Sequence, residues 1–119
     1  MAQIFDRNKA LIVVQGDENL LEELIDLFKG ESQRFLADVK EAVRAGEAEW
    51  LQRAARNIKG SLANLGAMAA CETAMKLESM GANNDMKQSD AMCEKLVAEV
   101  SEFEFETEKY RGINTPSQS

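Results

Sequence analysis

The stretch AARNIKGSLANLGA, residues 54–67, decides the fold because it combines a helical pattern of apolar residues with the glycine that ends it. Around a helix that turns about 100° per residue, the apolar positions of this region gather on one side. This buried side is predicted to consist of Leu51, Ala55, Ile58, Leu62 and Leu65. The opposite side is predicted to carry Arg53, Arg56, Gly60, Ala63 and Asn64, with Asn57 and Lys59 flanking Arg56. The sequence therefore predicts an amphipathic helix over residues 47–65.

Glycines and capping residues divide the rest of the chain into further helices. Asp6 and Asp17 are good N-cap residues, Gly46 suits the left-handed position after a helix, and the only proline is Pro116. The predicted helices cover residues 6–16, 17–46, 47–65, 67–80 and 90–110. Gly30 is a candidate for a bend in the longest of them. The apolar stripe of that helix is predicted to be Leu20, Leu24, Phe28, Phe35, Val39 and Val43.

Short loops between long amphipathic helices favour antiparallel neighbours in a bundle. We therefore predict an all-α fold, an antiparallel up-down-up-down four-helix bundle with a short extra N-terminal helix. Residues 1–110 are predicted to form this single domain, and a chain of 119 residues is long enough to build one core. Residues 111–119 are predicted to be a flexible C-terminal tail.

The composition argues against several classes of function. Apolar residues make up 45% of the chain, charged residues make up 29%, and the net charge is −7. This balance is typical of a soluble acidic protein and disfavours nucleic acid and anionic membranes as partners. The longest apolar run, residues 10–14, is too short to span a bilayer, and the N-terminus lacks the pattern of a secretory signal. We expect a cytoplasmic protein.

Few residues are available for catalysis. The chain has no histidine, which removes the commonest general base and the commonest transition-metal ligand. Cys71 and Cys93 lie in apolar helical contexts, so we expect reduced core thiols, with a disulfide between them as the alternative. No metal site, cofactor site or phosphate-binding loop is predicted. An enzyme is therefore the class of function that the sequence favours least.

The exposed face of the third predicted helix has two unusual features. Gly60 costs about 0.5–1 kcal/mol relative to alanine inside a helix, and no core packing explains a glycine on a solvent-facing side. Arg53, Arg56 and Lys59 are the only charged residues of the segment 50–71, although the chain as a whole is acidic. A partner with an acidic pocket would be steered toward such a face. The alternative is a solvated helix face on which the glycine has no role.

The motif in residues 55–67 resembles the central motif of histidine-containing phosphotransfer (Hpt) domains. That motif reads roughly Ala-His-x-Leu-Lys-Gly-Ser, followed by a stretch that ends Asn-Leu-Gly-Ala, and this chain has ARNIKGS followed by ANLGA. The segments IFDRNKAL and QGDENLLEELIDLFKGES resemble the start of the family, and LESMG resembles the end of its fourth helix. The resemblance covers about residues 4–110 and implies a four-helix bundle.

By this resemblance, the chain departs from the family at the phosphoacceptor. The family's histidine accepts a phosphoryl group from a receiver aspartate or a kinase and passes it on, and Arg56 stands in its place. Lys59 and Gly60 match the lysine that stabilises phosphoryl charge and the glycine that lets a receiver dock. A guanidinium has a pKa far above the physiological range, donates hydrogen bonds only and is no nucleophile. The resemblance therefore implies a degenerate phosphotransfer module, not an enzyme.

The resemblance also implies a partner and a site. The expected partner is the receiver domain of a response regulator, with a sensor histidine kinase of a two-component phosphorelay as a second candidate. The residues expected to contact it, without carrying phosphate, are Arg53, Arg56, Asn57, Lys59, Gly60, Ala63 and Asn64.

Two other interpretations stay open. The chain could be a variant of an otherwise active Hpt phosphotransfer protein, because one base change turns a histidine codon into an arginine codon. It could also be a helical-bundle adaptor that binds a basic partner through its acidic last helix, over residues 99–108.

Overall fold

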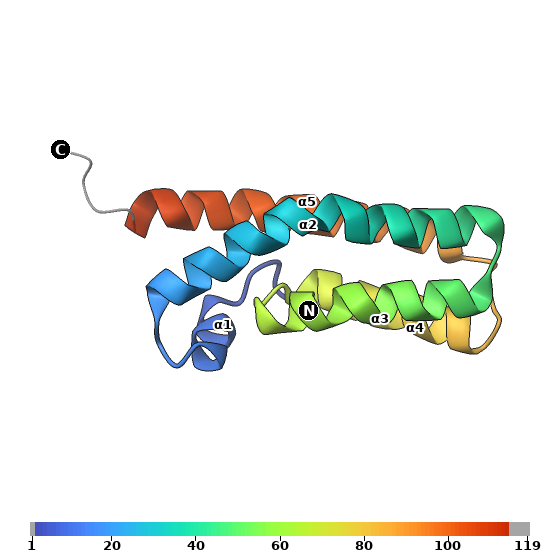
Figure 1. The fold of residues 1–119 in the computed structure, drawn as a ribbon, viewed down its shortest axis with the longest axis horizontal. Coiled ribbons are helices and arrows are strands. Elements are labelled where there is room, and N and C mark those ends of the chain that lie inside the picture. Colours follow the sequence, from blue (N-terminus) through green and yellow to red (C-terminus); the bar gives the residue numbers. More distant parts are fainter. Residues whose placement is uncertain (1, 115–119) are drawn as a thin grey trace.

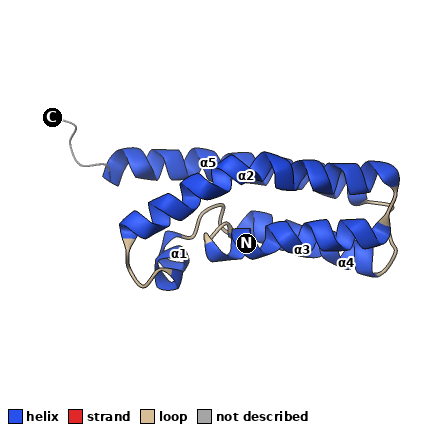
Figure 2. Cartoon of the chain, viewed as in Figure 1, coloured by secondary structure: helices blue, strands red, loops and turns tan. Residues whose placement is uncertain are grey.

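The chain folds into helices joined by short loops. The computed structural model describes the backbone of residues 2–114 and the side chains of residues 2–109. The helices in this range are α1 (Arg7–Val13), α2 (Glu18–Ala45), α3 (Ala48–Asn64), α4 (Met68–Ala82) and α5 (Ser89–Asn114). Figure 2 shows that the described part of the chain contains helices and loops without a strand. The predicted all-α class, with its short extra N-terminal helix, is confirmed.

Helices α2 to α5 alternate in direction and form an antiparallel bundle (Figure 1). The pair α3 and α4 makes the most extensive contact, and α2 and α5 pack on this pair and on each other. Helices α2 and α5 extend past the loop between α3 and α4, and α1 lies below this extension (Figure 1). The short first helix therefore covers an end of the bundle that α3 and α4 leave open.

The helix ends follow local signals in the sequence. The Asp6 carboxylate accepts a hydrogen bond from the Lys9 backbone N–H at 3.1 Å and caps α1. The Asp17 carboxylate accepts from the Leu20 N–H at 3.0 Å and caps α2. Gly46 ends α2 in the left-handed conformation, with a φ of 69°. All three predicted capping positions are confirmed.

The N-terminal segment crosses the loop between α3 and α4. The Asp6 N–H donates a hydrogen bond to the Gly66 carbonyl at 2.7 Å, and the Ala69 N–H donates to the Gln3 carbonyl at 2.8 Å. Gly66 has a φ of 74°, and a Cβ atom at this position would clash with the Asp6 carbonyl. Glycine is required here both by the backbone conformation and by the close approach of the crossing segment.

Gly81 lies inside α4 and not in the loop predicted after it. The residue is buried, and a Cβ atom there would lie 2.5 Å from the Ala48 carbonyl oxygen and 2.6 Å from the Gln52 backbone nitrogen. The missing side chain lets the backbones of α3 and α4 touch. This packing keeps the last turn of α4 helical, although glycine has a low intrinsic helix propensity.

The end of α5 also differs from the prediction. The helix continues past Tyr110 to Asn114, although Gly112 lies in this stretch and glycine has a low helix propensity. The remainder of the predicted tail, residues 115–119, lies outside the described part of the chain.

The core confirms the buried stripe of α3, whose five predicted residues are at most 3% exposed. In α2, Phe28 and Val39 are buried as predicted, but in the first turns the buried residues are Leu21 and Ile25, whereas Leu20 is exposed. Adjacent apolar pairs at 20–21 and 24–25 fit two stripes equally well, and packing against the other helices selects the second. Met75, an apolar residue of α4, is exposed.

Candidate functional site

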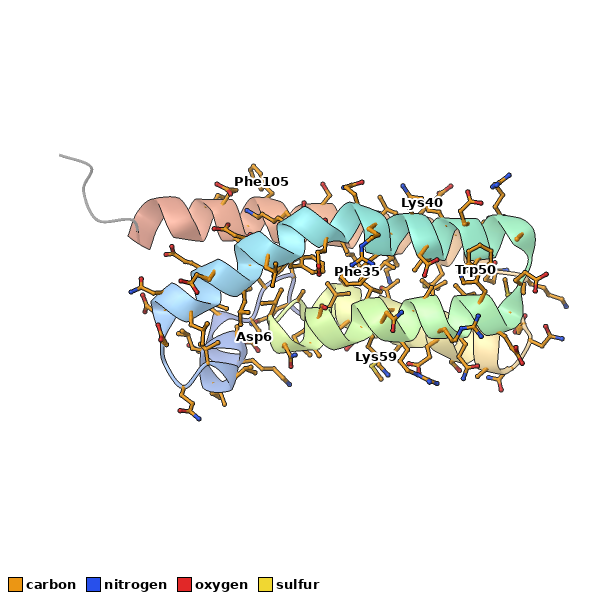
Figure 3. All side chains as sticks on the ribbon, viewed as in Figure 1. Asp6, Phe35, Lys40, Trp50, Lys59 and Phe105 are labelled. Atoms are coloured by element: carbon orange, nitrogen blue, oxygen red, sulfur yellow. The ribbon has the colours of Figure 1, made fainter. Side chains whose placement is uncertain are left out.

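The predicted interaction residues lie on the outward side of α3, opposite its buried stripe. Figure 3 shows Lys59 on the side of α3 that points away from α2. The Arg56 side chain is 57% exposed, so a partner can reach it. The exposed members of the predicted set are Arg53, Arg56, Asn57, Gly60 and Asn64, and the half-buried members are Lys59 and Ala63.

A carboxylate that the sequence reasoning missed completes this site. Arg56 Nε donates a hydrogen bond to Glu78 Oε2 at 2.9 Å, and Lys59 Nζ donates to Glu78 Oε1 at 2.6 Å. Glu78 belongs to α4, and packing of α4 on α3 brings it to the two cations. One signal was available, because Arg56 and Glu78 lie at nearly equal distances along the chain from the turn at Gly66.

The ion pairs lower the pKa of Glu78 below the ordinary value of a glutamate. The hydrogen bond from Lys59 is the largest cause, the one from Arg56 follows, and burial acts in the opposite direction. The Glu78 side chain is 17% exposed and that of Lys59 is 32% exposed, so this pair is better shielded from solvent than Arg56. Glu78 is therefore ionised at neutral pH and offsets part of the positive charge of Arg56 and Lys59.

We expect Glu78→Gln to cost about 1 kcal/mol of folding stability at neutral pH, since partly exposed ion pairs contribute up to about that amount each. A lowered carboxyl pKa stabilises the fold above the unfolded-state pKa, and this contribution disappears as pH falls through the folded-state pKa. Urea unfolding at neutral and at acidic pH should therefore show a difference between the two chains that shrinks on acidification. A difference that stays constant with pH would contradict this account.

Glu41→Gln is a matched control for that experiment. Glu41 also has a lowered pKa, caused first by a hydrogen bond from Arg44, but its ion pair lies within one turn of α2 and is exposed. Its removal should change stability less than the removal of Glu78 does.

The surface beside Gly60 is open and partly apolar. A Cβ atom at Gly60 would meet no other atom within 4 Å, so nothing in the fold requires a glycine there. A shallow hollow lies between α2 and the C-terminal part of α3, and Leu27 on its rim is 60% exposed. Its lining residues are Leu24, Leu27, Phe28, Glu31, Ser61, Asn64 and Leu65. This partly apolar hollow includes Asn64, one of the predicted interaction residues.

A second, more polar hollow separates α2 from the N-terminal part of α3. Trp50 lies between the two helices (Figure 3), and its Nε1 donates a hydrogen bond to Asp38 Oδ1 at 2.8 Å. Arg53, Arg56 and Asn57 line the same hollow. The Trp50–Asp38 hydrogen bond joins α2 to α3 beside the exposed arginines and engages the carboxylate that lines the same hollow.

Other reactive groups in the described part of the chain are shielded. Cys71 and Cys93 are free and buried, as predicted, and burial is the largest cause that raises the pKa of each thiol. Raised pKa values disfavour the nucleophilic thiolate. Among the described residues, no cluster of three or more His, Cys, Asp and Glu side chains could hold a metal ion. None of the helices in the described range is long and apolar enough to cross a membrane.

The fold and the exposed α3 motif define the class of helical-bundle phosphotransfer modules. The sequence matches the Hpt domain family over residues 23–105, and the chain belongs to that family. A crystal structure of histidine-containing phosphotransfer protein B (HptB) from Pseudomonas aeruginosa PAO1 has the same fold, with a TM-score of 0.84 and 22% sequence identity. The match covers 94% of this chain and 97% of that chain. A comparison with curated protein sequences gave no match.

Membership of this family sets the general role of the chain. Hpt domains are phosphotransfer modules of two-component phosphorelays, where they interact with response regulators and kinases. They carry phosphoryl groups and are not enzymes in the usual sense.

Proposed function

We propose that this chain is an Hpt-type module that docks on the receiver domain of a response regulator and does not carry phosphate. One observation supports this proposal above all: an exposed arginine occupies position 56, and the sequence contains no histidine. A guanidinium group donates hydrogen bonds only and has no lone pair to offer to phosphorus. The chain therefore retains the surface of a phosphotransfer module without its nucleophile.

The surroundings of Arg56 support docking on an acidic partner. A receiver domain presents a cluster of aspartates around its phosphoacceptor, and the planar guanidinium suits carboxylate or phosphoryl oxygens. Gly60 leaves open space one turn from Arg56, so the backbone of a partner can approach α3. Leu27 and Asn64 line the same hollow, so the exposed Leu27 offers a partner an apolar contact at one end of the predicted surface.

Phosphorylation assays test the missing nucleophile. After incubation with a phosphorylated receiver or a radiolabelled acyl phosphate, we expect no acid-labile label on this chain. Acid-labile label would show that the protein relays phosphate and would overturn this part of the proposal.

Binding assays with purified receiver domains test the docking face. We expect Arg56→Ala to weaken binding by about 30-fold, which corresponds to about 2 kcal/mol for a desolvated arginine at an interface. Gly60→Trp should abolish binding, because the indole would fill the space that the partner needs. Arg44→Ala and Ala98→Trp, which change exposed residues of α2 and α5, should leave the affinity unchanged. If the control variants weakened receiver binding as much as Arg56→Ala and Gly60→Trp do, the assigned docking surface would be wrong.

The adaptor interpretation has less support from the structure. Part of the acidic charge of α5 serves contacts between helices, since Glu104 accepts a hydrogen bond from Ser32 and Glu99 accepts one from Thr73. Glu108 forms an ion pair with Lys29 at 2.5 Å. Binding of a partner that depends on residues 99–108 and not on Gly60 would favour the adaptor over the receiver-docking module.

A further inference from the structure

Both cations at the centre of the site are already bound by one side chain of the same protein. Glu78 accepts a hydrogen bond from Arg56 with one carboxylate oxygen and from Lys59 with the other. Glu78 is the most shielded of the three side chains, and Arg56 is the most exposed. Among the described residues, Arg56 donates no hydrogen bond other than the one from Nε, so its terminal nitrogens are available to a partner.

From this geometry we infer that Glu78 is a specificity-determining residue that makes the site select the phosphorylated form of its receiver. The inference rests on the proposed docking function. Glu78 holds the position that an incoming anion would take between Arg56 and Lys59. A partner must either displace this carboxylate or bind next to its negative charge.

A receiver can present either an aspartate carboxylate or a phosphoryl group to Arg56 and Lys59. The chemistry of these two anions decides which of them can displace Glu78. A single carboxylate that replaces Glu78 regains the same two hydrogen bonds and gains little. A phosphoryl group carries a charge of about −1.5 to −2 and three acceptor oxygens. It can bind Lys59, Arg56 Nε and the free terminal nitrogens of the guanidinium together. Phosphorylated receivers therefore compete with Glu78 effectively, and unphosphorylated receivers do not.

The experiment compares two forms of one receiver domain, with Mg²⁺ alone and with Mg²⁺ plus beryllofluoride, which mimics the phosphoryl group. We expect the unsubstituted chain to bind the beryllofluoride form at least about tenfold more tightly, equivalent to about 1.4 kcal/mol. Glu78→Gln keeps the shape of the side chain but removes its charge. This variant should bind both forms more tightly, and its preference for the beryllofluoride form should fall severalfold.

Glu102→Gln is the control, because it removes the same charge from an exposed position of α5 and should leave the preference unchanged. Equal preferences in the unsubstituted chain and in Glu78→Gln would overturn the inference and leave the docking function standing. Weaker binding of Glu78→Gln to both forms would also overturn it, because Glu78 would then support binding. If neither chain binds any receiver, the docking function fails and the inference fails with it.

Discussion

Arg56→His is expected to convert the chain into an acceptor of phosphoryl groups. A neutral imidazole offers a lone pair near neutral pH, which the guanidinium does not. The side chain at position 56 is more than half exposed, and Lys59 lies beside it to stabilise the charge of a phosphoryl group. Incubation with a phosphorylated receiver should raise acid-labile label from background to a substantial fraction of the chains.

The structure also predicts how Glu78 affects this gain of function. Its negative charge would repel a phosphoryl group on the new histidine, since the carboxylate now lies 2.9 Å from Arg56 Nε. We expect the double variant Arg56→His, Glu78→Gln to accept phosphate about tenfold faster than the single variant, which corresponds to about 1.4 kcal/mol in the barrier. Rapid-quench measurements of the first turnover would compare the two rates.

Arg53→His is the matched control for these variants. Position 53 is also exposed on α3, one turn before position 56, but within the described residues no hydrogen bond or ion pair joins Arg53 to Glu78. We expect no acid-labile label on this variant. Label on Arg53→His equal to that on Arg56→His would show that any histidine on this face is sufficient, and that position 56 has no special role.

Gly81→Ala should be the most destabilising of the single-methyl changes in the helices. The new Cβ atom would lie 2.5 Å from the Ala48 carbonyl oxygen, and neither of these backbone positions can move without separating α3 from α4. Overpacking of this kind costs roughly 1–3 kcal/mol. Urea denaturation should show this loss as a lower midpoint with an unchanged slope.

Gly60→Ala provides the comparison, since it places the same methyl group inside a helix where no atom lies within 4 Å. It should raise stability by about 0.5–1 kcal/mol, because alanine favours the helix and restricts the unfolded chain. If both variants gained stability, the close approach of α3 and α4 at Gly81 would be wrong.

The sequence was sufficient for the helices because their signals are local. Asp6, Asp17 and Gly46 act on backbone groups within one turn, and the buried stripe of α3 repeats with the period of the helix itself. The apolar pattern was ambiguous in the first turns of α2, where two different buried stripes fit the sequence equally well. The local signals also failed at Gly81, because a glycine that ends a helix and a glycine that lets two helices touch look the same in a sequence.

For the candidate site as well, some features follow from the sequence and others only from the tertiary structure. Sequence alone determined that an exposed helix face carries Arg56, Lys59 and Gly60 and that the chain has no histidine, since both follow from residue identity and helical period. Only the tertiary structure decided that Glu78 lies between the two cations and that Leu27 lines a hollow with Asn64. These neighbours come from other helices, and their distance from Arg56 depends on how the helices pack, which no local pattern encodes.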